Sequence, residues 1–162
     1  MLETGTTLAQ RYEIKKQLGG GASSRVYLVY DRQDGRNRVL KEIEKSPDSR
    51  FCAFARREAE IVRRLKYPYF PEIFAMLETG DADCLVMEYL QGETAGQRLR
   101  RLGALPVEEV LRWGKDLCLM LSYLHGSVPS LVYCDMKPDN IMIQPEGNLR
   151  LIDFGAVQMC ED

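Results

Sequence analysis

The sequence predicts an α+β fold, in which a small antiparallel sheet carrying one helix is followed by a second, mainly helical part. Residues 25–31 and 38–43 alternate apolar and polar side chains in the way that half-buried strands do. Residues 51–66 instead repeat apolar side chains at helical spacing. The pattern is interrupted at Gln91-Gly92, and helical segments dominate the chain beyond that point.

The composition is that of an ordinary globular protein and excludes several other classes. The chain has 162 residues, of which 45% are hydrophobic and 28% are charged, so it is neither a disordered tail nor a collagen-like fibre. Lys and Arg total 22 against 24 Asp and Glu, and the net charge of -2 gives no electrostatic footprint for nucleic acid. The single histidine, His125, excludes a polyhistidine metal site.

The cysteines and the N-terminus favour a cytoplasmic protein. Five widely spaced cysteines without a C-x-x-C pair fit reduced thiols. Residues 1–10 lack the basic region and apolar core of an export signal. The longest uncharged stretch, 117–134, is broken by His125, Gly126 and Pro129, so we expect a helix end, a turn and a strand there rather than a membrane segment.

The first part of the chain predicts three strands joined by turns. Residues 11–18 form the first strand, which ends at three consecutive glycines, Gly19 to Gly21. Asp34-Gly35 is a turn signal between the next two strands, at 25–31 and 38–43. The glycines are therefore expected in a hairpin loop.

Residues 51–66 predict the clearest helix in the sequence, and Tyr67-Pro68 ends it. Its apolar stripe is formed by Phe51, Phe54, Ala55, Ile61, Val62 and Leu65. Glu58 stands at the position where this stripe should continue. A carboxylate on an apolar face is costly unless a basic group meets it.

Further strands are expected at 72–77 and 84–90, with a turn at Gly80-Asp81. We place a boundary after residue 90, which gives an N-terminal extension at 1–11, a first part at 12–90 and a second part at 91–162. The second part predicts helices at 95–102 and 106–124, the latter stopped by Gly126, and short strands at 131–133, 141–144 and 149–152.

Gly19-x-Gly21-x-x-Ser24-x-Val26 is a variant glycine-rich loop. Alone it is a weak signal, because glycines in a hairpin are usually turn residues. A dinucleotide-binding fold would need a helix directly after the glycines, and a Walker-type loop would end in Gly-Lys-Ser/Thr. What remains is a strand-turn-strand flap whose backbone amides could approach phosphate oxygens closely.

Lys41 and Glu58 are best explained together. By strand alternation Lys41 shares a face with Val39 and Ile43, which are expected to face the core. In isolation, a lysine at a strand edge usually extends its amine into solvent. Because Glu58 lies on the apolar stripe of the next helix, it supplies a partner, and the pair could orient an ammonium group towards phosphates.

The segments 133–140 and 152–155 carry a second group of polar residues. Each could be an ordinary loop, but together they place Asp135, Asn140 and Asp153 at the ends of short strands, with Lys137 among them. Carboxylate and amide oxygens are the ligands that magnesium prefers. An aspartate near a hydroxyl nucleophile can also accept its proton.

The glycine-rich loop, Lys41, Glu58, the D-x-K-P-x-N motif at 135–140 and the D-F-G motif at 153–155 match, in this order, the signature set of protein kinases. From about Tyr12 onwards the chain most resembles the eukaryotic-like serine/threonine kinases of bacteria. The resemblance implies a protein-kinase-like fold, with an N-lobe and hinge at 12–90 and a partial C-lobe at 91–162.

The resemblance also implies an ATP site. Lys41, paired with Glu58, would contact the α- and β-phosphates, and Met87 would stand at the back of the site. Glu88 and Leu90 would offer backbone hydrogen bonds to the base. The full implied set of nucleotide-binding residues is Leu18, Gly19, Gly20, Gly21, Ala22, Ser24, Val26, Val39, Lys41, Glu58, Met87, Glu88, Leu90 and Met142.

For phosphoryl transfer, the resemblance implies Asp135 as the catalytic base and Lys137 as the residue that neutralises the transferring phosphate. Asn140 and Asp153 would hold Mg2+. The implied cofactors are ATP and Mg2+, and the implied partner is a protein substrate with a serine or threonine hydroxyl.

The sequence departs from the family pattern at three places. Tyr133-Cys134 replaces the usual His-Arg before the base, and Ser24 replaces a glycine of the loop. Tyr133 is expected to fill the structural place of the histidine, whereas the missing arginine argues against control by a phosphate on the activation loop. Cys134 is expected to be a semi-buried, inert thiol.

The third departure is that the sequence ends at Asp162, seven residues after Gly155, without the activation segment or the Ala-Pro-Glu motif. We therefore expect a C-terminally truncated kinase region. Its helix at 107–124 would expose an apolar face that favours self-association. Two alternatives stay open, namely an ATP-binding fragment without turnover that acts through partners, and a small-molecule kinase of related fold.

Overall fold

The computed structural model describes residues 2–21, 24–45, 65 and 68–160. The chain forms two compact units, and each is described here by itself. The first comprises Met1–Leu65 and Glu72–Tyr89, and the second comprises Lys66–Pro71 and Leu90–Asp162. The predicted helix at 51–66, which carries Glu58, lies outside the described residues except for Leu65.

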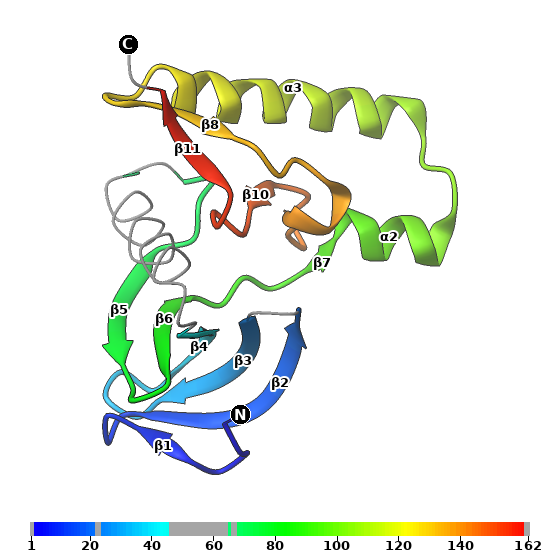
Figure 1. The fold of residues 1–162 in the computed structure, drawn as a ribbon. Coiled ribbons are helices and arrows are strands. Elements are labelled where there is room, and N and C mark those ends of the chain that lie inside the picture. The colour runs from blue at the N-terminus through cyan, green and yellow to red at the C-terminus, as the bar shows by residue number, and fades with distance from the viewer. Residues whose placement is uncertain (1, 22–23, 46–64, 66–67, 161–162) are drawn as a thin grey trace. The chain divides into compact units, whose positions relative to one another are not determined.

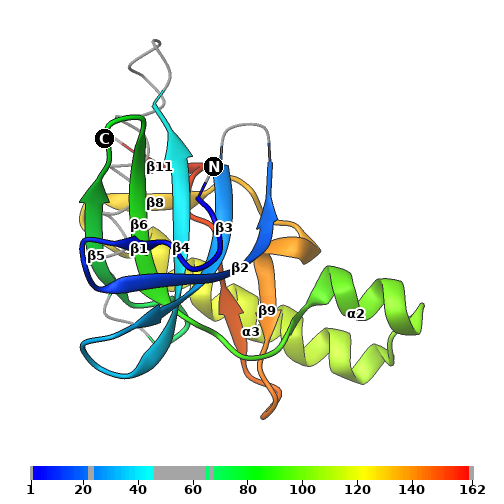
Figure 2. The same ribbon diagram turned by 90° about the horizontal axis from the view of Figure 1, so that it is seen from below.

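In its described part, the first unit is a six-stranded antiparallel sheet with the strand order β1-β2-β3-β4-β6-β5 (Figures 1 and 2). The strands are β1 (Thr7–Leu8), β2 (Tyr12–Gly20), β3 (Ser24–Asp31), β4 (Arg36–Glu44), β5 (Ile73–Glu78) and β6 (Ala82–Glu88). The longer strands were predicted from their alternation. The antiparallel sheet that was expected for this part of the chain is confirmed.

The core of this sheet is formed by side chains from its central strands. They are Tyr12, Ile14, Tyr27, Val29, Leu40, Cys84 and Val86. Leu2 and Leu8 pack against this core. The amide of Gly5 donates to the carbonyl of Ile14, and the amide of Ile14 donates to the carbonyl of Thr6. Residues before β2 therefore cover part of the sheet's apolar face.

Lys41 lies on the face of β4 that also carries Val39 and Ile43; Ile43 is buried, while Val39 and Lys41 are half-buried. The other face carries Arg38, Leu40 and Glu42, which are all buried. β4 is a central strand between β3 and β6, so both of its faces carry apolar residues. Alternation alone does not tell which of the two faces the core.

The second unit contains two helices and two small sheets, of strand order β10-β9-β7 and β11-β8, in the residues described. Its elements are β7 (Glu93–Thr94), α2 (Ala95–Leu102), α3 (Val107–His125), β8 (Ser130–Tyr133), η1 (Pro138–Asn140), β9 (Ile141–Ile143), β10 (Leu149–Leu151) and β11 (Val157–Cys160). In Figure 1, α3 runs alongside β8, and α2 lies beside the turn η1.

Both predicted helices of this unit are confirmed, and their ends have local causes. Thr94 and Gln97 form a capping box at the start of α2. Pro106 is the N-cap of α3 rather than its first residue, and the amide of Gly126 closes the helix on Ser122 and Leu124. Neither helix, nor any other in the described part of the chain, has the length and apolar character needed to cross a bilayer.

α3 has two faces of different character. Trp113, Met120 and Leu124 are buried, whereas Val107 and Leu111 are 72% and 68% exposed. An exposed apolar face on this helix was expected from the sequence.

One buried ion pair closes the first unit at the end of β3. Asp31 is fully buried, and Arg11 donates two hydrogen bonds of 2.6 Å to its two carboxylate oxygens. The amide of Gln33 donates a third, at 3.0 Å. The hydrogen bonds from Arg11 lower the pKa of the Asp31 carboxyl from its ordinary value of 3.8.

We predict that Arg11→Ala lowers the free energy of unfolding by more than Arg32→Ala does, because it removes the cation that bonds both oxygens of the buried Asp31 carboxylate. Arg32→Ala is the matched control, since Arg32 pairs with Glu13 at the surface and such pairs contribute about 0–1 kcal/mol. The lowered pKa of Asp31 contributes stability that is lost as the pH falls through it. The difference in unfolding free energy between wild type and Arg11→Ala should therefore shrink as the pH falls below about 4. Urea unfolding at pH 7 and pH 3 measures both effects, and equal losses for the two variants would contradict this account.

Candidate functional site

The loop between β8 and β9 holds three of the predicted site residues together. Asn140 is 5% exposed, and its Nδ2 donates to the backbone carbonyl of Asp135 at 2.9 Å and to Asp135 Oδ2 at 2.8 Å. Lys137 Nζ lies 2.6 Å from the same Oδ2. The amide of Asn140 also donates to the carbonyl of Lys137, which closes the turn η1. The sequence Lys-Pro-Asp-Asn therefore folds so that its amide and amine converge on one carboxylate.

The electrostatics of this loop favour a charged lysine. The hydrogen bond to Asp135 raises the pKa of Lys137, and the nearby charges of Asp153 and Asp139 add to the effect. The side chains of Asp135 and Lys137 are 39% and 50% exposed, so both reach solvent. The arrangement offers a carboxylate that can accept a proton beside a cation that can offset an anionic group.

Asp153 reaches the same region from the end of β10. The amide of Ile152 donates to the carbonyl of Asn140 at 2.9 Å, so the two segments lie side by side at this point. Asp153 has a φ of 66°, in the left-handed region that non-glycine residues rarely occupy. Its Oδ1 accepts a hydrogen bond from the amide of Gly155 at 3.2 Å.

The donor atoms fit a magnesium ion that keeps water or phosphate among its ligands. Because Nδ2 of Asn140 is bound to Asp135, its Oδ1 is the atom left to act as a ligand. Asp153 adds a carboxylate, and such oxygens suit Mg2+. No group of three or more His, Cys, Asp or Glu residues in the described ranges could hold a metal on its own.

Tyr133 connects the loop to the segment that carries Asp153. It is 5% exposed, and its hydroxyl lies 2.6 Å from the carbonyl oxygen of Ile152 and 3.0 Å from that of Asp153. Its ring contacts Phe154 edge-on, with a centroid distance of 5.6 Å. Tyr133 thus holds the backbone on both sides of Asp153 in its left-handed conformation.

Phe154 extends this packing to the segment before β5. Its ring also contacts Phe70 edge-on at 5.3 Å, and both rings are buried. Arg150 donates to the carbonyl of Phe70, and the amide of Leu151 donates to that of Tyr69. These contacts explain why residues 66–71 belong to the second unit although β5 belongs to the first.

Cys134, expected to be semi-buried, is exposed. It directly follows Tyr133, the buried last residue of β8. The thiol lies 3.6 Å from the carbonyl of Val132.

The residues predicted to bind nucleotide phosphates lie in the first unit, on neighbouring strands. β2 and β3 form the predicted hairpin, in which Gly19 pairs with Val26 and the amide of Gly21 donates to the carbonyl of Ser24 at 2.8 Å. Val26 is in turn the partner of Lys41 across β3 and β4. Leu18 is exposed, while Ala22, like Glu58, lies outside the described residues.

The predicted base-contacting residues divide between the two units. Met87 pairs with Val39 in the first unit. The amide of Glu88 donates to the carbonyl of Glu72 at 2.8 Å, so this amide is already used within the sheet. Leu90, which is buried, and Met142 of β9 belong to the second unit.

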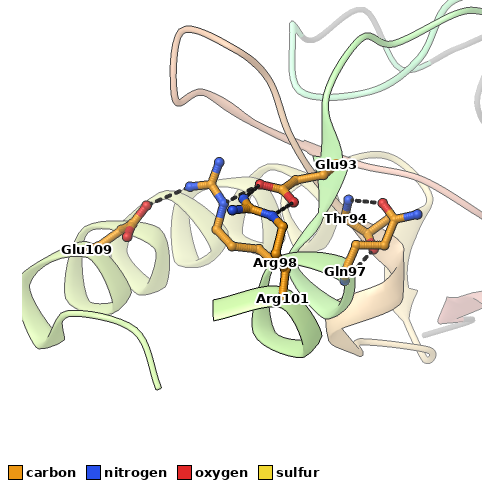
Figure 3. Close-up of polar contacts among 6 residues, drawn as sticks. All are labelled: Glu93, Thr94, Gln97, Arg98, Arg101 and Glu109. Atoms are coloured by element: carbon orange, nitrogen blue, oxygen red, sulfur yellow. Dashed lines mark hydrogen bonds and ion pairs between the residues drawn. The ribbon is translucent and has the colours of Figure 1, made fainter. Parts of the chain in front are cut away.

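An ion-pair network that the sequence analysis missed fixes α2 in the second unit (Figure 3). Glu93 on β7 accepts hydrogen bonds from Arg98 at 2.9 Å and from Arg101 at 2.6 Å. Arg98 also reaches Glu109 of α3 at 2.8 Å. Hydrogen bonds from Arg101 and then Arg98 lower the pKa of Glu93. The sequence shows several arginines in one predicted helix, but the acidic partners of these arginines are set by how β7, α2 and α3 pack.

A model of the protein kinase domain matches residues 12–162. Among the most similar relatives, CBL-interacting serine/threonine-protein kinase 18 of Arabidopsis thaliana is 32% identical over 156 residues, which cover 95% of this chain and 29% of the relative. Serine/threonine-protein kinase PknG of Mycobacterium leprae (strain TN) is 35% identical over 164 residues, covering 96% and 21%. Serine/threonine-protein kinase PrkC of Bacillus subtilis (strain 168) is 31% identical over 153 residues, covering 93% and 23%. The chain thus spans less than a third of the length of these relatives.

We predict that Tyr133→Phe lowers the free energy of unfolding by about 1 kcal/mol, because the carbonyls of Ile152 and Asp153 lose their shared hydroxyl donor while the ring packing is kept. The amide of Gly155, which bonds Asp153, should also exchange its hydrogen faster. Tyr30→Phe is the control, since the Tyr30 hydroxyl makes no hydrogen bond within the described part of the chain. Denaturant unfolding and hydrogen exchange measure the two effects. Unchanged exchange at Gly155 would show that the hydroxyl does not hold this segment.

Proposed function

The chain belongs to the protein kinase family, and from this premise we propose that it is a serine/threonine protein kinase that transfers the γ-phosphoryl group of ATP to a protein hydroxyl. The observation that carries the proposal is the convergence of Asn140 and Lys137 on the Asp135 carboxylate, with the segment of Asp153 bonded alongside. The convergence supports the proposal because it gathers a carboxylate, an ammonium group and an amide in one loop of the second unit, as general-base and metal-assisted chemistry would require.

In the proposed reaction, Asp135 accepts the proton of the attacking hydroxyl, and its two hydrogen-bond donors hold the carboxylate in one orientation. Lys137 offsets charge on the transferring phosphoryl group. The hydroxyl oxygen forms the new bond to phosphorus as the bond to the β-phosphate oxygen breaks, and ADP leaves.

Asn140 and Asp153 are the proposed ligands of magnesium. When bound, Mg2+ would neutralise phosphate charge and favour departure of the β-phosphate oxygen. The chain's own contribution is to fix the Asn140 amide through Asp135 and to hold the backbone at Asp153 through Tyr133.

The proposed nucleotide contacts of the first unit come from the glycine-rich hairpin, from Lys41 on β4 and from the hinge. Lys41 would bind the α- and β-phosphates with Glu58 as its partner. The pairing of Val26 with Lys41 supports this proposal, because it places the lysine directly beside the strand that leaves the hairpin.

We further propose that the chain is of the bacterial eukaryotic-like type and acts in the cytoplasm. Similarity to the bacterial PknG and PrkC kinases supports the first point, although plant kinases match comparably. The free cysteines Cys84, Cys118, Cys134 and Cys160 support a reducing compartment. The proposed partner is a protein substrate, and the exposed apolar residues of α3 are the surface proposed for self-association.

We predict that Asp135→Asn abolishes transfer while leaving Mg·ATP binding intact, since it removes the proton acceptor and keeps the shape. A loss on the order of 100- to 10,000-fold is expected for a general base. Transfer of labelled phosphate to a generic protein substrate measures the rate, and calorimetry measures binding. Asp81→Asn, in a turn of the first unit, is the control. Full activity of Asp135→Asn would show that the base is misassigned, and wild-type binding without transfer would favour the ATP-binding fragment instead.

Lys41→Ala should weaken the use of ATP, because a charge-assisted contact to phosphate is lost. We expect KM for ATP to rise on the order of 10- to 100-fold, the equivalent of a charged hydrogen bond of about 1.5–3 kcal/mol. Lys16→Ala, an exposed lysine on β2, is the matched control. Steady-state kinetics of the wild type, Lys41→Ala and Lys16→Ala measure KM for ATP. A wild-type KM in Lys41→Ala would show that this residue does not bind ATP.

A further inference from the structure

The segment 92–101 contacts the loop of Asp135 at two places, namely at β9, the strand that follows the loop, and at η1 within the loop. β7 pairs with β9, so that Glu93 lies opposite Ile143 and Thr94 opposite Met142. Gly92 has a φ of 138°, and a Cβ at this position would overlap the carbonyl oxygen of Ile143. The close approach therefore requires glycine, and it holds β7 against the last residue of β9.

The first turn of α2 makes a second contact, in the middle of the loop. Gly96 is buried, and a Cβ there would overlap Oδ1 of Asp139 and lie 2.8 Å from its Cγ. The Asp139 carboxylate thus fills the space in which any other residue at position 96 would place its side chain. One helical turn later, Arg100 donates to the same Oδ1 at 2.9 Å.

α2 is itself held on both sides, so the contact is made against a fixed element. The capping box joins the Thr94 amide to Gln97 at 2.8 Å and the Gln97 amide to Thr94 at 3.1 Å. Figure 3 shows Arg98 between Glu93 and Glu109, while Arg101 also bonds Glu93. β7 and α3 therefore determine the position of the helix.

Asp139 lies in η1 between Lys137 and Asn140, whose backbone groups bond each other across it. Because the turn spans only three residues, any change in the backbone at Asp139 is passed directly to these two neighbours. We propose that Gly96 and Arg100 are positioning residues for phosphoryl transfer, which act through Asp139 on Lys137 and Asn140. The proposal rests on the function proposed above for these two residues.

Gly96→Ala separates positioning from stability. Alanine favours a helix over glycine, so the melting temperature should not fall, whereas the added methyl group must displace the Asp139 carboxylate. We expect kcat to fall on the order of tenfold to a hundredfold, as displacements of about 1 Å can cause, with KM for ATP little changed. Gly114→Ala is the matched control, since no atom of the described residues lies within 4 Å of a Cβ at that position of α3.

Removing the carboxylate should remove the effect of the methyl group. In the Asp139→Ala background, Gly96→Ala is therefore expected to cause no further loss of kcat. Arg100→Ala should lower kcat, while Arg101→Ala, which leaves Glu93 paired with Arg98, should not. A decrease in kcat that is the same in the presence and absence of the Asp139 carboxylate would overturn the proposal.

Hydrogen exchange tests the inference without activity. The amide of Asn140 donates to the carbonyl of Lys137, and the amide of Ile152 donates to that of Asn140. Both amides should exchange faster in Gly96→Ala and Arg100→Ala than in the control variants Gly114→Ala and Arg101→Ala. If the wild type transfers no phosphate, the proposed function fails, but the exchange rates still decide whether α2 positions this loop. Exchange at both amides that is unchanged in Gly96→Ala would overturn the inference.

Discussion

The site of the second unit depends on the side-chain amide of Asn140. This buried amide is bonded to both the backbone and the carboxylate of Asp135, so it fixes the residue as a whole rather than only its side chain. The backbone carbonyl of Asn140 accepts the amide of Ile152 and thereby brings in the segment of Asp153. Since a buried polar group left without partners is costly, each of these bonds constrains the others.

Around this amide, the second unit is built so that short elements support each other. All five of its described strands and the turn η1 are only two to four residues long, and none could be stable alone. Tyr133 and Phe154 contribute the apolar packing beneath the loop, while β7 and α2 contact it from another side. The polar geometry of the site thus depends on packing contacts made by residues that carry no chemistry themselves.

The sequence predicted the elements whose residues repeat with a clear period. The longer strands of the first unit and both helices of the second were found in this way, and the limits of α2 agree with its pattern. The short strands predicted at 131–133, 141–144 and 149–152 correspond to β8, β9 and β10. β1, β7, β11 and η1 were missed, since such short elements form only where a partner strand or turn is supplied. For β4 the pattern left the core-facing side undetermined, since this central strand has buried residues on both faces.

For the site, spacing and residue type predicted which side chains matter but not how they are held. Asp135, Lys137, Asn140 and Asp153 were identified from two short motifs, and the structure brings them into one region. The two carbonyls held by Tyr133 and the contact of Gly96 with Asp139 join residues far apart in sequence. Such contacts follow from tertiary packing, which no local pattern encodes.

The most direct measurement of the central claim is paramagnetic broadening by Mn2+ in the presence of ATP, recorded on the isotopically labelled chain. The account predicts that the Asn140 side-chain amide and the backbone amides around Asp153 broaden first, while those of Glu93 and Gly114 remain sharp. Broadening that is absent at Asn140 and Asp153, or that centres on another group of residues, would contradict the assignment of this loop as the metal and phosphate site.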